Sequence, residues 1–180
     1  RYPLVELAAG ALAAGCWLWL GPTPGAAAAF VLVYLLGVIA IIDWQHMIIP
    51  HSLTVSGMVA GLALAEVAGP GLPRALLGLL AGGGLVWALS AGYRVLRGQA
   101  GMGGGDVMLM AMVGAFLGPG AAAAVLGLGA LLGTLYALAS GGGRLAGTAK
   151  LPFGTFLAAA AAGVLVAGPA VWTWYLGLLT

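Results

Sequence analysis

The sequence predicts an all-helical (all-α) integral membrane protein: a polytopic bundle of about seven transmembrane helices, with six and eight as the limits. Of its 180 residues, 63% are hydrophobic and 6% are charged, which leaves too little polar material to cover a water-soluble surface. Apolar runs recur to the end of the chain, most of them near the ~20 residues that a spanning helix needs. The 33 glycines suit membrane helices that pack closely through small residues.

Glycine, proline and charged residues divide the chain into seven apolar segments. The predicted helices are Leu4–Leu20, Gly25–Ile42, Ser52–Ala68, Arg74–Tyr93, Asp106–Leu117, Gly120–Ala139 and Phe153–Leu179. The fifth is short, because Gly118-Pro119 interrupts an apolar run that continues beyond it. We expect a single membrane domain over residues 1–180, since the connections are too short to form a separate soluble domain.

The basic residues predict the side of the membrane on which each connection lies. If the spans alternate in direction, five of the six basic residues fall on one side: Arg1, Arg94, Arg97, Arg144 and Lys150. Only Arg74 falls on the other side, beside Glu66. The positive-inside rule makes the five-charge side cytoplasmic. The net charge of +2 therefore bears on topology, and we expect no nucleic-acid partner.

Two aspartates are the candidate catalytic residues. The chain has four acidic residues in all, and carboxylates near lipid are costly and usually functional. Asp43 closes one apolar run and Asp106 opens another, so the topology places both at the cytoplasmic ends of their helices. Two facing carboxylates can share one proton. The ionised one can then activate water while the protonated one polarises a carbonyl, with no metal or cofactor.

Each aspartate taken singly also has a structural interpretation. Asp106 could be only a helix N-cap, and Asp43 could be an interfacial residue that reaches water. His46 and His51 could join Asp43 around a metal, but their spacing is not a strong ligand pattern, and solvated loop histidines are the better interpretation. Cys16 is the single cysteine, which excludes an internal disulfide and a cysteine-based zinc site.

Two segments resemble the signature of type IV prepilin peptidases. In the first, Asp43 is followed by Ile49-Pro50 and a short polar turn. In the second, Gly103-Gly104-Gly105-Asp106 has the family's Gly-x-Gly-Asp form at the start of a helix. Further parts of the family pattern are matched in the family's order along the chain. One lies before these two segments, at Arg1–Glu6, and two lie after them, at Gly114–Gly118 and Leu151–Leu157. The resemblance implies that Asp43 and Asp106 are the catalytic dyad, supported by Ile49, Pro50, Gly103 and Gly105.

The resemblance further implies a membrane aspartic endopeptidase of the bacterial inner (cytoplasmic) membrane. Its substrate would be a prepilin of a type IV pilus or a pseudopilin of type II secretion, cut after a Gly at the cytoplasmic face. One departure is Met108, where many members carry Lys. A second is the absence here of the earlier helix and the Cys-x-x-C cytoplasmic region of bifunctional members. We therefore expect no methyltransferase activity from this chain, and expect that it begins partway into a longer protein.

Two other classes of function fit parts of the pattern. A small transporter could use Asp43 and Asp106 to bind a proton or cation, as intramembrane carboxylates commonly do. Such a site should lie near the bilayer midplane, whereas these aspartates are predicted at one edge. The chain could also be a structural subunit of a secretion complex, in which case neutralising both aspartates should leave its function intact.

Overall fold

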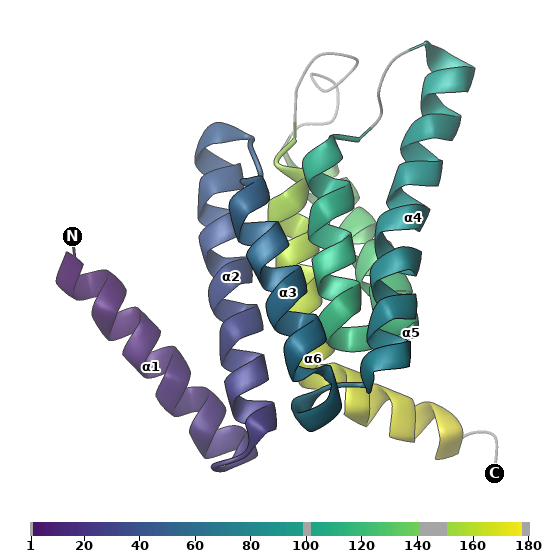
Figure 1. Ribbon diagram of the computed structural model, residues 1–180. Helices are drawn as coiled ribbons and strands as arrows, with labels where there is room; N and C mark the ends of the chain where they lie inside the picture. Colours follow the sequence, from purple (N-terminus) through teal and green to yellow (C-terminus); the bar gives the residue numbers. More distant parts are fainter. Residues whose placement is uncertain (1, 99–101, 141–150, 178–180) are drawn as a thin grey trace.

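A computed structural model describes residues 2–98, 102–140 and 151–177, with side chains over 5–98, 102–140 and 151–168. Within these ranges the chain forms helices joined by short connections (Figure 1). They are α1 (Tyr2–Leu20), α2 (Pro24–His46), α3 (His51–Ala68), α4 (Leu72–Arg97), α5 (Gly104–Ala139) and α6 (Phe153–Gly177). The predicted all-helical class is confirmed.

Four helices are long and apolar enough to cross a bilayer, namely α2 to α5. In α1 and α6 the described apolar stretches are shorter, Val5–Leu20 and Phe153–Gly168. Many large apolar side chains point outward from the bundle, as in Leu18, Val95 and Leu96, which are 84–85% exposed. Helices that satisfy their own backbone groups and present apolar side chains outward are what a bilayer requires. The protein is therefore a multi-span membrane protein.

Gly118 reverses the direction of α5. Its φ of 81° and ψ of 175° break the helix, and Pro119 follows. A Cβ placed on Gly82 of α4 would touch the Met110 carbonyl and lie 3.4 Å from the Ala122 Cβ. In one continuous helix those two residues would be about 18 Å apart. The two arms of α5 therefore lie side by side, as the separate predicted helices Asp106–Leu117 and Gly120–Ala139 require.

The first arm of α5 lies at the centre of the bundle. Its side chains from Leu109 to Val113 are almost all fully buried. Glycines on its neighbours allow the close approach, because a Cβ on Gly78 of α4 would strike the Gly114 carbonyl, and one on Gly57 of α3 would strike the Met112 sulfur. This packing through small residues replaces the hydrophobic driving force that helices lack in lipid.

The helix α1 is held much less firmly than the rest. Among the described helices, its backbone packs closely only against that of α2, and Figure 1 shows the two meeting at one end and diverging toward the other. Cys16 is its one buried side chain among the residues whose side chains are described. The central bundle of α2 to α6 thus forms its core without α1.

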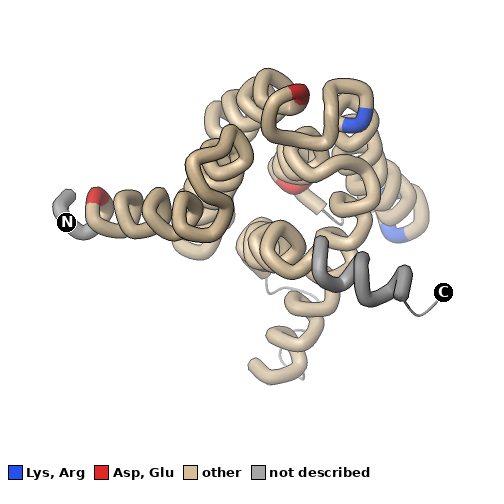
Figure 2. The backbone as a smooth tube through the Cα atoms, turned by 90° about the horizontal axis from the view of Figure 1, so that it is seen from below, with Lys and Arg blue, Asp and Glu red and all other residues tan. Residues whose placement is uncertain are grey.

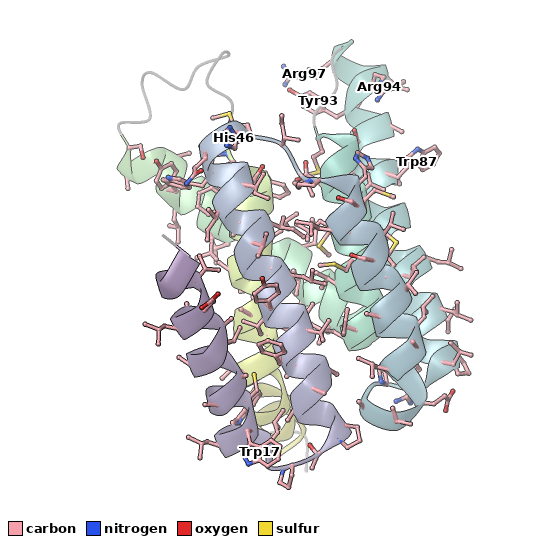
Figure 3. All side chains as sticks on the ribbon, turned by 60° about the vertical axis from the view of Figure 1, so that its left-hand side comes forward. Trp17, His46, Trp87, Tyr93, Arg94 and Arg97 are labelled. Carbon is pink, nitrogen blue, oxygen red and sulfur yellow. The ribbon has the colours of Figure 1, made fainter. Side chains whose placement is uncertain are left out.

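Charged groups are sparse along the chain, and Figure 2 shows long uninterrupted stretches of tube without them. Arg94 and Arg97 lie in the last turn of α4, at the same end of the molecule as His46 of α2 (Figure 3). Trp17 lies at the opposite end. The other basic residues assigned to the cytoplasmic side, Arg1, Arg144 and Lys150, fall outside the described residues.

Candidate active site

Asp43 lies in the last turn of α2, where the helix is closed by an unusual residue. Met47 adopts a left-handed conformation with φ 54° and donates its N–H to the Asp43 carbonyl over 2.8 Å. A left-handed residue after the last turn is a common way to end a helix, although glycine usually fills it. The Asp43 side chain is only 5% exposed.

Ile49 and Pro50 connect this end of α2 to the start of α3. Pro50 is the N-cap residue of α3, and its carbonyl accepts the first helical N–H groups, from Leu53 and Thr54. Proline suits this position because the N–H that it lacks would have no partner. The residue before a proline is pushed toward extended backbone, and Ile49 turns its side chain inward and is 7% exposed.

Asp106 lies in the first turn of α5 and holds its own helix start. Its Oδ2 accepts a hydrogen bond from the Gly103 N–H over 3.0 Å, the side-chain half of a capping box. The side chain is 8% exposed. Among the described glycines, those with positive φ are Gly21, Gly71, Gly98 and Gly118, so Gly103–Gly105 do not adopt the left-handed angles that favour glycine.

Another segment of the chain approaches these glycines closely at Gly105. A Cβ on Gly105 would lie 2.8 Å from the Cβ of Ile49. A Cβ on Gly103 would find its nearest atom at an ordinary 3.5 Å, and one on Gly104 would find nothing within 4 Å. Of the two predicted motif glycines, Gly105 therefore has a steric role, whereas Gly103 contributes its backbone N–H.

The start of α6 supplies the partners of Asp43. The Thr155 N–H donates to Asp43 Oδ2 over 2.8 Å, and the Thr155 hydroxyl lies 3.2 Å from the same oxygen and 3.1 Å from the Ala40 carbonyl. Gly154 is pressed against the carboxyl, since a Cβ there would lie 3.0 Å from Asp43 Oδ2. Asp43 thus caps a helix that begins 110 residues later in the chain.

Ile49 joins the two halves of the site. Its side chain is wedged between Gly105, beside Asp106, and Gly154, beside Asp43. Ile49 thus links the segment that carries Asp106 to the residues that contact Asp43. Among the described residues, every hydrogen bond to these side chains ends on Oδ2, so each Oδ1 is the oxygen left for water or a substrate.

The site lies at the end of the bundle that carries His46, Arg94 and Arg97 (Figure 3). His46 and His51 are both exposed. The described part of the chain contains no cluster of three or more His, Cys, Asp or Glu side chains that could hold a metal ion. What the geometry offers is a pair of buried carboxylates, which can hold and transfer a proton.

The structure brings together all the predicted site residues: Asp43, Asp106, Ile49, Pro50, Gly103 and Gly105. Sequence reasoning missed Gly154 and Thr155 as members of the site. The signal was present, because the segment Leu151–Leu157 was one of the family-like segments, but its contact with Asp43 depends on how α6 packs on α2. Met108, two residues after Asp106, is half-buried.

Residues 30–138 match the type IV leader peptidase family. Three relatives, each named prepilin leader peptidase/N-methyltransferase, come from Burkholderia pseudomallei (strain 1026b), Myxococcus xanthus and Klebsiella pneumoniae. They are 42%, 44% and 37% identical to this chain over 119 residues. The matches cover 65% of this chain but only 38%, 35% and 52% of the respective relatives. No solved structure matches the chain.

Proposed function

This chain belongs to the type IV leader peptidase family, and we propose that it is a membrane aspartic endopeptidase whose catalytic dyad is Asp43 and Asp106. The observation that carries the proposal is the convergence of the two carboxylates. They are 63 residues apart in the sequence, on different helices, and both are more than nine-tenths buried. Ile49 packs between Gly105, beside Asp106, and Gly154, beside Asp43. Carboxylates buried near lipid are costly, and such sites are usually functional.

The proposed chemistry is a hydrolysis by a shared-proton pair. The ionised carboxylate takes a proton from a water molecule, and the resulting oxygen attacks the scissile carbonyl carbon. The protonated carboxylate donates a hydrogen bond to the carbonyl oxygen as negative charge develops there. The amine leaves with a proton from the dyad, which returns the pair to its starting state. The proposal uses no metal and no cofactor.

We further propose the substrate and the place of cleavage. The relatives' names indicate prepilin leaders, and the proposed substrate is a prepilin or type II secretion pseudopilin with a short leader and an apolar helix. Cleavage would follow a Gly at the cytoplasmic face of the bacterial inner membrane. The position of Arg94 and Arg97 at the site's end of the bundle supports a cytoplasmic site through the positive-inside rule.

The test is cleavage of a co-expressed prepilin, followed by the change in gel mobility. Asp43→Asn and Asp106→Asn should each lower the cleavage rate by about a thousandfold or more, because each removes a proton carrier. Glu6→Gln, the same change at an exposed acid of α1, should leave the rate unchanged. Asn keeps an oxygen for the Thr155 and Gly103 N–H groups, so folding should be retained, which a thermal melt of the purified protein checks.

The same assay can overturn the proposal. Normal cleavage by both single variants would remove Asp43 and Asp106 from the mechanism. No cleavage by the folded wild-type chain, either alone or when it is extended with the N-terminal part of a relative, would refute the peptidase proposal. Proton-flux measurements in liposomes would then test the transporter hypothesis with the same two variants.

A further inference from the structure

Asp43 is held by two donors from one residue of another helix. We infer that Thr155 is a positioning residue for Asp43, which fixes Oδ2 through its N–H and its hydroxyl and leaves Oδ1 for the reaction. The inference rests on the proposed function for its catalytic consequence. The contact itself is independent of that function, since both donors lie within 3.2 Å of the same oxygen.

The backbone donor follows from the place of Thr155 in α6. Thr155 lies in the first turn, where helical N–H groups lack a partner in the preceding turn. Pro152, just before the helix, has no side chain that could cap it. The Thr155 N–H has only a longer contact of 3.2 Å with the Pro152 carbonyl, against 2.8 Å to Asp43. The carboxylate is thus the principal acceptor for this N–H group.

The hydroxyl adds a feature that the backbone cannot supply. It carries one proton and has two acceptors within reach, Asp43 Oδ2 and the Ala40 carbonyl. When Asp43 is ionised, the hydroxyl can donate to Oδ2. When a proton resides on Oδ2, that proton can be donated to the hydroxyl oxygen while the hydroxyl donates to Ala40. Thr155 can therefore hold the carboxyl in one orientation through both protonation states of a proton-transfer cycle.

A purely structural role for Thr155 makes the opposite predictions from a positioning role. Thr155→Val keeps the shape and the methyl group but removes the hydroxyl, whereas Thr155→Ser keeps the hydroxyl but removes the methyl group. If the hydroxyl positions Asp43, the valine variant should lose about tenfold in kcat with little change in KM. The serine variant should recover most of that loss. Thr134→Val is the matched control, because the Thr134 hydroxyl donates within its own helix, to the Ala130 carbonyl.

A second measurement does not depend on peptidase activity. Asp43 and Asp106 are the chain's two aspartates, so protein labelled with ¹³C at aspartate Cγ gives two carboxyl signals, which Asp106→Asn assigns. We expect Thr155→Val to move the Asp43 signal, Thr155→Ser to move it much less, and Thr134→Val to leave both signals in place. The Asp106 signal should respond less than that of Asp43 in every variant.

The two measurements separate the two proposals. If the Asp43 signal does not move in Thr155→Val, the positioning role is wrong. It is also wrong if Thr155→Ser is less active than Thr155→Val. If the Asp43 signal moves as expected but the wild-type chain cleaves no prepilin, the contact stands and the peptidase function fails. Thermal melts of each variant ensure that the comparison is made between folded proteins.

Discussion

The two carboxylates of the site are held in different ways. Asp106 is fixed by the N–H of Gly103, three residues earlier in the same helix start. Asp43 is fixed by Thr155, 112 residues later and on a different helix. One half of the dyad is therefore complete as soon as its own turn forms. The other half is complete only when α6 has docked on α2. Assembly of the dyad therefore depends on packing between helices that are distant in the sequence.

Among changes that keep both carboxylates, the most damaging should be a methyl group on Gly154, beside Asp43. In Gly154→Ala the new Cβ would lie 3.0 Å from Asp43 Oδ2, 3.1 Å from its Cγ and 2.6 Å from the Ile49 Cδ1. Ile49 can swing its end away, but the carboxyl is tied to Thr155. We expect prepilin cleavage to fall by about 100-fold or more, because small misplacements of a reacting group have effects of that size.

Gly163→Ala, on the same helix, is the control for that prediction, since its Cβ would have no atom within 4 Å. Its cleavage rate should match that of the wild type. Equal activity of the two alanine variants would show that Gly154 does not limit the position of Asp43.

On the Asp106 side, Gly105→Ala should act mainly on stability. Its Cβ would lie 2.8 Å from the Ile49 Cβ, an atom attached to the backbone that cannot rotate away. We expect a loss of about 1–3 kcal/mol in the free energy of unfolding. Gly104→Ala, with nothing within 4 Å, should change it by no more than about 1 kcal/mol and in the stabilising direction. Thermal melts of the two alanine variants in one detergent would compare their stabilities. Equal melting temperatures would contradict the close packing of Ile49 against Gly105.

Truncating the carboxylates themselves compares the two attachments directly. Asp43→Ala leaves the Thr155 N–H without its principal acceptor and should lower the free energy of unfolding by about 1–3 kcal/mol. Asp106→Ala should cost about 1 kcal/mol, as loss of a helix cap does, because Gly103 is exposed and water can replace the lost acceptor. A larger loss of melting temperature for Asp106→Ala would reverse the comparison.

The smallest effect should come from the hydrogen bond that ties Met102, just before the Gly103–Asp106 start of α5, to α4. The hydroxyl of Ser90, a buried residue of α4, donates to the Met102 carbonyl over 3.1 Å. Ser90→Ala should lower the free energy of unfolding by about 1 kcal/mol. Ser56→Ala, which removes an exposed hydroxyl bonded to its own helix, should have no measurable effect. If Ser90→Ala also abolished cleavage, the Asp106 side would depend on distant contacts as much as the Asp43 side does.

This difference explains how much of the molecule could be predicted from its sequence. The helix positions follow from apolar length and from breaks at glycine and proline, and each predicted segment has a counterpart. The Gly103–Asp106 start of α5 could also be predicted, because its contacts span three residues. Even the reversal at Gly118 was signalled locally, by a glycine and a proline inside an apolar run.

The contacts of Asp43 could not be predicted in the same way. Its partner Thr155 belongs to a helix whose start shows no hydrophobic period or charge that points to α2. The wedge at Ile49 likewise depends on two glycines, Gly105 and Gly154, that come together only in the folded bundle. At the start of α5, none of Gly103–Gly105 has a positive φ, and it is at Gly105 that a side chain would collide with Ile49.

The register of the central helix has a consequence for the shape of the membrane surface around the dyad. The glycine contacts of α5 with α3 and α4 put Asp106 level with His51, the first residue of α3, and with Val86, well inside α4. Arg94 lies eight residues beyond that level, about 12 Å farther along the helix. With the lipid headgroups level with His51, the last turns of α4 extend beyond them into water on one side of the carboxylates. Beside the carboxylates, α4 therefore extends about 12 Å farther along the bundle than the start of α3, so these two sides of the site differ in height.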